Sequence, residues 1–442
     1  MAFIAYFLSR ADVLVYFSIF IALFIYWING IKKRTAKMPT GPIPLPVIGN
    51  LHLVDLERPH ESLMQLSEKY GEIFTLHFGP KKMVILAGYK IIKEALVTRA
   101  EDFGERAISP IFDVFSNGHG IIFSNGETWK SMRRFTISTL RDFGMGKKSV
   151  EARIQNELMP LIESIKSHNG KPFNIHLLIS SAVSNVICSI IFGKRFEYDD
   201  PMFESLIKML HENARLAGTP TVMESTKVET LFNEENLLIS VLDLFSAGTE
   251  TTSTTIRWGI LLLMKYPEIQ KRVQEEIKTH IKPGQLPTVE DRKKMPYTDA
   301  VIHEIQRFGN IVPLNLSHST PTDVYLRGYL IPKGTEVIPF LTSVLYDKTQ
   351  WKTPYDFNPN HFLNENGKFV RHDAFMPFSV GRRACAGEAL AKMELFLVFT
   401  GILQAFTFYP PPGVSREDLN LKPSVGFTLV PTPYMTCAKP NY

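Results

Sequence analysis

The apolar positions of the chain are concentrated first at its N-terminus. Residues 13–28 are almost wholly apolar, and residues 1–8 are apolar as well. The preceding flank has one basic side chain, Arg10, whereas a basic cluster follows the apolar run: Lys32, Lys33, Arg34 and Lys37. This pattern predicts a membrane anchor over residues 1–31 that leaves the rest of the chain on the cytosolic side. A cleaved signal peptide is the alternative, but no small-residue cleavage site follows the apolar run.

Alternating prolines come next, in residues 39–46 (PTGPIPLP). Proline fixes φ and favours an extended, polyproline-like backbone. We therefore expect residues 32–50 to form a basic, proline-rich hinge. It would join the anchor to one large catalytic body over residues 51–442, because no linker-like stretch divides that body.

One unusually long helix is predicted within this body. Residues 234–265 have helical periodicity, and the pattern ends before Pro267. At 1.5 Å per residue the helix extends about 48 Å, enough to cross the body. Hydroxyl side chains, which are poor helix formers, crowd its middle at residues 247–255 (AGTETTSTT). The early part has an apolar face formed by Leu237, Leu238, Val241, Leu242 and Phe245.

Composition narrows the class of protein. The chain has 442 residues, of which 45% are hydrophobic and 21% charged, an ordinary globular balance. The net charge of +5, without a long basic run, gives no support for nucleic-acid binding. Three cysteines without regular spacing, Cys188, Cys385 and Cys437, argue against a disulfide framework and for a reducing compartment. Cys188 lies in an apolar run and is expected in the core.

Cys385 alone has neighbours suited to chemistry. It lies in residues 378–387 (FSVGRRACAG), between glycines and just after two arginines. A thiolate is a soft, electron-rich ligand for haem iron. The alternative is a buried structural cysteine beside a basic turn.

The neighbours of this cysteine each have a physical reason to be present. Gly381 and Gly387 permit a tight turn and a close approach of the backbone to a flat cofactor. Arg383 can pair with a haem propionate. The helix predicted to begin near Ala386 directs N–H groups at the sulfur and would lower its pKa. Phe378 can pack over the sulfur and exclude water.

The middle of the long helix offers a second candidate centre. Gly248 leaves room for a small diatomic ligand, and Glu250 and Thr251 place an acid beside an alcohol. This pair suits proton delivery, because cleavage of an O–O bond consumes protons. The alternative is a Thr-rich buried helix without chemistry.

The cysteine segment and the acid–alcohol pair resemble the haem-binding signature and the oxygen-activation motif of the cytochrome P-450 superfamily. The likeness extends from the anchor to the C-terminus. It is closest to the vertebrate-type microsomal family 2, through residues 135–146, 245–255, 295–300 and 387–396.

This resemblance implies a mainly α fold with small β-sheets (α+β) and haem, iron protoporphyrin IX, with Cys385 as the axial ligand of its iron. It further implies a monooxygenase on the cytosolic face of the endoplasmic reticulum membrane. Such an enzyme inserts one atom of O2 into a lipophilic small molecule of the fatty acid or xenobiotic class. Its electrons come from an NADPH-dependent reductase, and Thr251 with Glu250 assists protonation.

The resemblance also assigns residues around the cofactor. Trp129 and Arg133 match a Trp-x-x-x-Arg motif whose side chains suit a propionate. Arg106 and His318 fall where further propionate contacts are expected, although a surface position is the default for Arg106.

Other residues are assigned a supporting role. Glu304 and Arg307 match the Glu-x-x-Arg motif of the superfamily, and His361 would be the third member of that structural network. A basic patch for an acidic electron donor would be formed by Lys130, Arg134, Arg141 and Arg382. An ordinary solvated charged face is the alternative.

One departure from the family pattern concerns the cavity roof. Between residues 216 and 231 the chain is too short for the loop and about two helices that relatives carry there. The break falls near Met223 and Glu224. Its expected cost is an apolar wall exposed to water and water entry into the pocket.

This departure leaves three functions open. The first is the monooxygenase. The second is a catalytically impaired, haem-binding shortened isoform that binds or sequesters the reductase. The third, a haem-thiolate isomerase that needs no O2, is disfavoured by the intact pair of Glu250 and Thr251.

Overall fold

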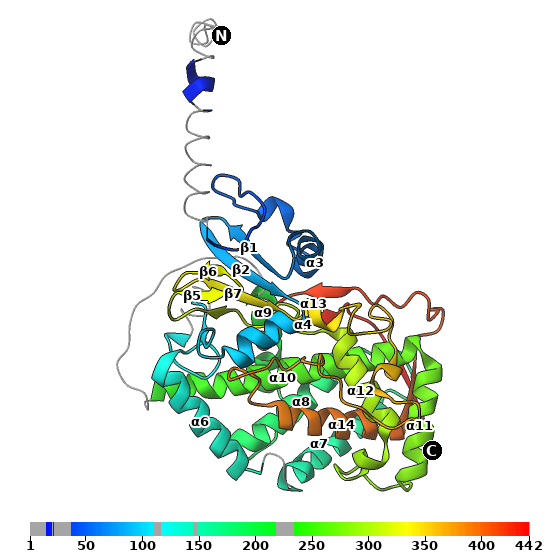
Figure 1. Cartoon of the computed structure of the whole chain (residues 1–442). Helices are drawn as coiled ribbons and strands as arrows, with labels where there is room; N and C mark the ends of the chain where they lie inside the picture. Colours follow the sequence, from blue (N-terminus) through cyan, green and yellow to red (C-terminus); the bar gives the residue numbers. More distant parts are fainter. Residues whose placement is uncertain are drawn as a thin grey trace, which may run out of the picture.

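The predicted long helix is present as α10 (Glu234–Lys265), which runs through the middle of the body in Figure 1. The structure is a computed structural model and describes residues 15–19, 21, 37–108, 116–144, 148–217 and 234–441. These residues also form the longer helices α3 (Pro59–Tyr70), α6 (Gly126–Asp142), α7 (Lys148–Lys166), α8 (His176–Ile191), α9 (Pro201–Ala217), α11 (Pro267–His280), α12 (Pro296–Gly309) and α14 (Glu388–Ala405). The short helical segments are η1 (Leu51–Leu53), α4 (Tyr89–Lys93), η2 (Glu94–Thr98), η3 (Asp291–Lys294), α13 (Thr342–Leu345) and η4 (Pro359–Phe362).

The two halves of α10 have different surroundings. The C-terminal half, from Thr252 to Met264, is buried throughout and packs against α8, α12 and α14, where the largest hydrophobic core lies. Of the early apolar face, only Phe245 is fully buried. Leu237 and Leu238 are 56% and 57% exposed. Helical periodicity therefore predicted the helix correctly but not the burial of its first turns.

The strands β1, β2, β5, β6 and β7 lie to one side of the helical body, as Figure 1 shows. The largest sheet has the strand order β1-β2-β7-β4-β3, in which β2 and β7 are parallel and the other neighbours antiparallel. Its strands are β1 (Ile73–Phe78), β2 (Lys81–Ala87), β3 (Glu105–Arg106), β4 (His318–Ser319) and β7 (Glu336–Phe340). Three two-stranded ribbons pair β5 (Val324–Leu326) with β6 (Tyr329–Ile331), β8 (Phe406–Tyr409) with β11 (Cys437–Pro440), and β9 (Pro423–Val425) with β10 (Leu429–Pro431). The predicted mixture of many helices and small sheets is confirmed for the described residues.

The proline-rich segment is bound to the body. The backbone N–H and the hydroxyl of Thr75 in β1 donate to the carbonyls of Thr40 (3.2 Å) and Pro39 (2.8 Å). A Cβ at Gly41 would lie 2.0 Å from the carbonyl oxygen of Thr75, so only glycine fits. Residues 39–41 are therefore held against the sheet.

Two predicted features fall on residues with no structural description. Most of the anchor, residues 1–31, and most of the shortened roof, residues 216–231, lie outside the described ranges. Within those ranges, no helix has the length and apolar character that a membrane span requires.

Candidate active site

A cavity of about 470 Å³ lies against the middle of α10. Cys385 lines it from the segment that precedes α14, and Gly248, Glu250 and Thr251 line it from α10. The two candidate centres of the sequence analysis, more than 100 residues apart along the chain, thus meet in one cavity.

The cysteine loop is a tight turn that requires Gly381. This residue has φ = +79°, and a Cβ there would lie 1.8 Å from the carbonyl oxygen of Leu96 in η2. The predicted turn is present, but the close approach is to the protein backbone. Gly387 has φ = −91°, which any residue adopts, so the prediction that it shapes the turn is wrong. It is the N-cap residue of α14.

We expect Gly381→Ala to displace the cysteine loop, because the added methyl group collides with a backbone atom and the backbone angle is strained. The expected loss of stability is about 2 kcal/mol or more, measured by urea denaturation followed by circular dichroism. Gly367→Ala is the matched control, since Gly367 also has a positive φ but open space around it. Equal effects of both substitutions would contradict the role of the Leu96 contact.

The surroundings of Cys385 have opposite effects on the pKa of its thiol. Burial raises the pKa of the Cys385 thiol, whereas the N–H groups of Gly387 and Glu388 and the charge of Arg133 act to lower it. The predicted lowering by the helix start is confirmed, but burial outweighs it, and the net shift of the pKa is upward. The side chain is open to the cavity although protein surrounds it. A bound metal cation would supply the charge that favours the thiolate.

Buried hydrogen-bond donors converge near the cysteine. Arg383 donates from Nε to the carbonyl of Gly104 (2.8 Å) and from Nη2 to that of Ser124 (3.0 Å). Its guanidinium carbon lies 3.8 Å from the centroid of the Trp129 ring. Among the described residues, Arg383 Nη1 and Trp129 Nε1 have no acceptor.

Arg106 extends this group of donors. It is 5% exposed, so the default expectation that Arg106 lies on the surface is wrong. Nη1 donates to the carbonyl of Leu316 (3.0 Å) and to His318 Nε2 (2.9 Å), and Nε has no acceptor in the described part of the chain. His318 Nδ1 donates to the carbonyl of Phe103 (2.6 Å). Both nitrogens of His318 are thus engaged, and its Nε2 orients Arg106.

Three guanidinium groups face one another across this part of the cavity. Arg133 lines it and donates from Nη2 to the carbonyl of Ala384 (2.6 Å). Burial and the neighbouring Arg133 charge lower the pKa of Arg106 to about 9. Burial and the charges of Arg106, Arg133 and Arg382 lower the pKa of Arg383 to about 8. An anion among them would relieve this repulsion and satisfy the free donors.

The acid and the alcohol of α10 have separate partners. Thr251 Oγ1 donates to the carbonyl of Ala247 (2.7 Å), one turn back. Glu250 Oε2 contacts His211 Nδ1 (2.7 Å), and Oε1 accepts from Thr428 Oγ1 (3.0 Å). A Cβ at Gly248 would lie 2.7 Å from Ile187 Cδ1, so this glycine permits close packing on α8.

Sequence comparisons relate this chain to known proteins. The family model described as "Cytochrome P450" matches residues 39–225 and 218–438. Cytochrome P450 2K1 of Oncorhynchus mykiss is 48% identical over 467 residues, covering 92% of both chains. Cytochrome P450 2J2 of Homo sapiens is 43% identical over 469 residues, covering 93% of both.

The chain belongs to the cytochrome P450 family. Its relatives also include cytochrome P450 2C3 of Oryctolagus cuniculus, at 43% identity over 91% of this chain. These names all denote family 2, as the sequence resemblance predicts.

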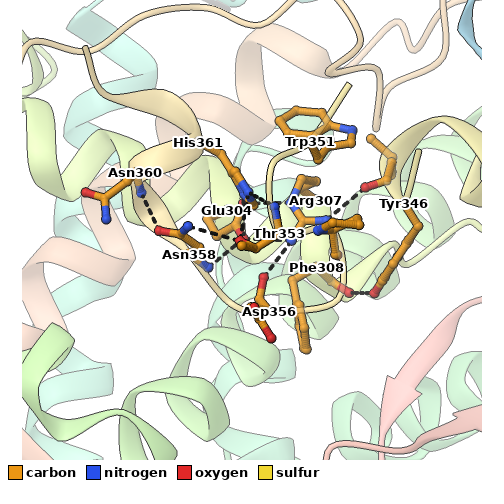
Figure 2. A network of polar contacts seen from close by, with 12 residues as sticks. Glu304, Arg307, Phe308, Tyr346, Trp351, Thr353, Asp356, Asn358, Asn360 and His361 are labelled. Atoms are coloured by element: carbon orange, nitrogen blue, oxygen red, sulfur yellow. Dashed lines mark hydrogen bonds and ion pairs between the residues drawn. The ribbon is translucent and has the colours of Figure 1, made fainter. Parts of the chain in front are cut away.

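The supporting network of this cytochrome P450 is shown in Figure 2. Arg307 donates from Nε and Nη2 to the Glu304 carboxylate (2.8 and 2.7 Å), and both side chains are fully buried. His361 Nδ1 lies 3.2 Å from the same carboxylate. Arg307 also donates to the carbonyls of Leu345, Pro354 and Asp356, so α12 holds this downstream segment in place.

Two features of this P450 were not predicted from its sequence. Asp243 Oδ2 accepts from the N–H groups of Ile121 and Ile122 (2.7 and 3.1 Å) and ties that loop to α10. His211 contacts Glu250 from α9. Neither residue belongs to a motif or a periodic pattern, so no sequence signal pointed to them.

Proposed function

We propose that this cytochrome P450 is a haem-thiolate monooxygenase that inserts one atom of O2 into a lipophilic small molecule. The observation that carries the proposal is the single cavity that joins Cys385 to Glu250 and Thr251. Between these polar ends its walls are largely apolar, with Ile121, Ile122, Leu210, Ile311, Leu316 and Phe427 among the lining residues. Such walls suit the fatty acid or xenobiotic class of substrate.

The residues present fit haem. Its two propionates match the free donors of Trp129, Arg106 and Arg383, and its apolar ring matches the cavity walls. Cys385 would hold the iron, with Arg133 beside it. When bound, haem supplies a redox-active iron at which O2 is reduced. The chain itself binds and orients the substrate, limits water, and holds or moves protons at Thr251 Oγ1 and the Glu250 carboxylate.

The proposal also includes the electron donor and the cellular location of the enzyme. We assign an NADPH-dependent cytochrome P450 reductase as the electron donor and the endoplasmic reticulum membrane as the site of action. Positive charge for docking the reductase would come from Lys130, Arg134 and Arg141 of α6 and from Arg382. Of these, Lys130 pairs with Glu127 (2.6 Å) and Arg382 pairs with Glu101. The anchor over residues 1–31 would hold the protein on membrane lipid.

The shortened roof is part of the proposal and has support from the comparisons. The alignment with the 2K1 relative extends over 467 residues, more than the 442 of this chain, so it must contain gaps in this chain. The family model matches in two stretches that meet at residues 218–225. Both observations support a deletion near Met223.

The cavity of this shorter form still has a wall on that side. Leu210, Asn213 and Ala214 of α9 line it, and the Phe427 N–H donates to the carbonyl of Ala214 (3.0 Å). This closure favours the catalytic function over the impaired isoform. The exposed residues Leu237, Leu238 and Leu242 mark the face that a longer roof would cover.

Turnover by the protein with reductase and NADPH tests the proposal. Lauric acid and a lipophilic drug-like amine serve as probes, and oxygenated product is quantified by mass spectrometry with ¹⁸O2. Incorporation of one labelled atom is the expected result. A haem-loaded protein that consumes NADPH without labelled product from any lipophilic probe would overturn it.

Thr251→Ala should lower the product formed per NADPH by about tenfold or more, because a proton-donating hydroxyl is lost. The electrons would instead appear in released hydrogen peroxide. Thr279→Ala is the matched control, since Thr279 Oγ1 makes the same bond one turn back, to the carbonyl of Glu275 (2.8 Å), at an exposed position of α11. An unchanged product yield in Thr251→Ala would remove Thr251 from the mechanism.

A further inference from the structure

A chain of three polar side chains leads from the protein exterior to Glu250. His176 lies at the start of α8, His211 on α9 and Glu250 on α10. His176 Nε2 lies 3.1 Å from His211 Nε2, and His211 Nδ1 lies 2.7 Å from Glu250 Oε2. The side chains of His211 and Glu250 are 16% and 10% exposed, so protein largely encloses their contact.

The outer end of this chain reaches a second, smaller cavity. His176 lines a pocket of about 60 Å³ together with Asn174, Arg257, Pro433 and Tyr434. Asn174 and Pro433 are exposed, and the volume is sufficient for water. The inner end is Glu250, which lines the main cavity beside Thr251. The three residues therefore connect two separate cavities.

We propose that His176, His211 and Glu250 form a proton-conducting path from the outer pocket to the main cavity. The inference rests on the proposed function, which consumes protons in the main cavity. Imidazole suits the task because it can take a proton at one nitrogen while giving one up at the other.

At rest the outer histidine is neutral, and the inner carboxyl group is charged. Burial and the charge of Arg257 lower the pKa of His176 to about 3, so its ring is neutral at pH 7 and carries one N–H. Burial acts to raise the pKa of Glu250, but hydrogen bonds from His211 and Thr428 and the nearby positive charges leave it lowered. Glu250 is thus a carboxylate at rest that can accept a proton.

The proton balance closes at every step. In the resting chain, His211 donates from Nδ1 to Glu250, and its bare Nε2 accepts from the Nε2–H of His176. A proton from pocket water binds His176 Nδ1, and the Nε2 proton of His176 moves to His211 Nε2. The Nδ1 proton of His211 then moves to Glu250 Oε2. One N–H forms and one breaks on each ring, so the net change is one proton gained by Glu250.

Two other roles for this cluster fail on the geometry. Ser180 Oγ lies 3.1 Å from His211 Nε2, which gives the order Ser–His–Glu of a hydrolase triad. However, Ser180 is fully buried and lines neither cavity, so no substrate can reach it. Within the described ranges, no set of three or more His, Cys, Asp or Glu side chains is arranged to hold a metal ion.

Proton exchange tests the path without turnover. Protein with ¹⁵N-labelled histidine, reduced and bound to carbon monoxide, is transferred to D2O, and loss of the His211 N–H signal is followed by NMR. His176→Gln should slow this loss at least tenfold. His168→Gln is the control, since His168 lies outside the path and bonds to the carbonyl of Ser164. An unchanged exchange rate in His176→Gln would overturn the proton path, regardless of how much oxygenated product the enzyme forms.

Turnover provides the second arm. His176→Gln and His211→Gln should each lower product per NADPH by about tenfold and raise hydrogen peroxide release, with the carbon monoxide spectrum unchanged as evidence of folding. Full product yield in both variants would overturn the path but leave the monooxygenase proposal standing. A wild-type protein without labelled product would overturn the monooxygenase proposal, and the exchange measurement would then decide the path alone.

Discussion

Replacing Cys385 by alanine is expected to abolish the strongly red-shifted Soret band that a thiolate-ligated haem protein gives when reduced and exposed to carbon monoxide. The other cysteines cannot substitute for it, since Cys188 and Cys437 are buried and neither lines the cavity. Only a thiolate donates enough electron density to the iron to produce this shift. We expect complete loss of the band together with loss of product formation.

Cys437→Ala is the matched control for this experiment. It removes a thiol of the same size from β11 and should leave the shifted band in place. The bound haem is quantified separately, because the donors of Trp129, Arg106 and Arg383 could retain haem without the sulfur. A shifted band that persists in Cys385→Ala would show that another group ligates the iron.

Replacing Arg307 by leucine is expected to destabilise the fold by about 3–5 kcal/mol, the usual cost of removing one partner from a buried ion pair. Among the described residues, the Glu304 carboxylate would keep His361 and the Asn358 N–H as its close partners. Three carbonyl groups in residues 345–356 would lose their donor as well. Urea denaturation followed by circular dichroism measures the loss.

A surface ion pair of the same spacing serves as the control for this substitution. Lys293 and Glu290 have the same i, i+3 spacing and a 2.7 Å contact, but their side chains are 74% and 73% exposed. Lys293→Leu should give no measurable change, because exposed pairs contribute little. Equal unfolding midpoints for Arg307→Leu and the wild type would contradict a structural role for the network.

The spacing of residues along the chain predicted some contacts of this protein but gave no information on others. The i, i+3 separation of Glu304 and Arg307 predicted their pairing, because both lie on one helix face. It could not predict that Arg307 also reaches carbonyls about 40 residues downstream, since that depends on how a later segment folds back. The need for glycine at 381 was similarly visible, but its contact with Leu96 was not.

The largest gaps in prediction concern tertiary packing between helices. His211 and Glu250 are 39 residues apart and meet only because α9 crosses α10. The apolar face at the start of α10 predicted burial, yet Leu237 and Leu238 are exposed, since periodicity records which side is apolar and not what covers it.

The stacking of Trp129 on Arg383 gives this protein an internal optical reporter. The chain has four tryptophans, and among the three in the described residues it is Trp129 whose ring lies under the guanidinium that faces the proposed propionates. Trp258 and Trp351 are buried and donate to the carbonyls of Leu429 and Val344. Haem absorbs light where indole emits it, so a cofactor at the proposed site would quench Trp129 strongly. Cofactor uptake is therefore readable from the fluorescence of the unlabelled chain.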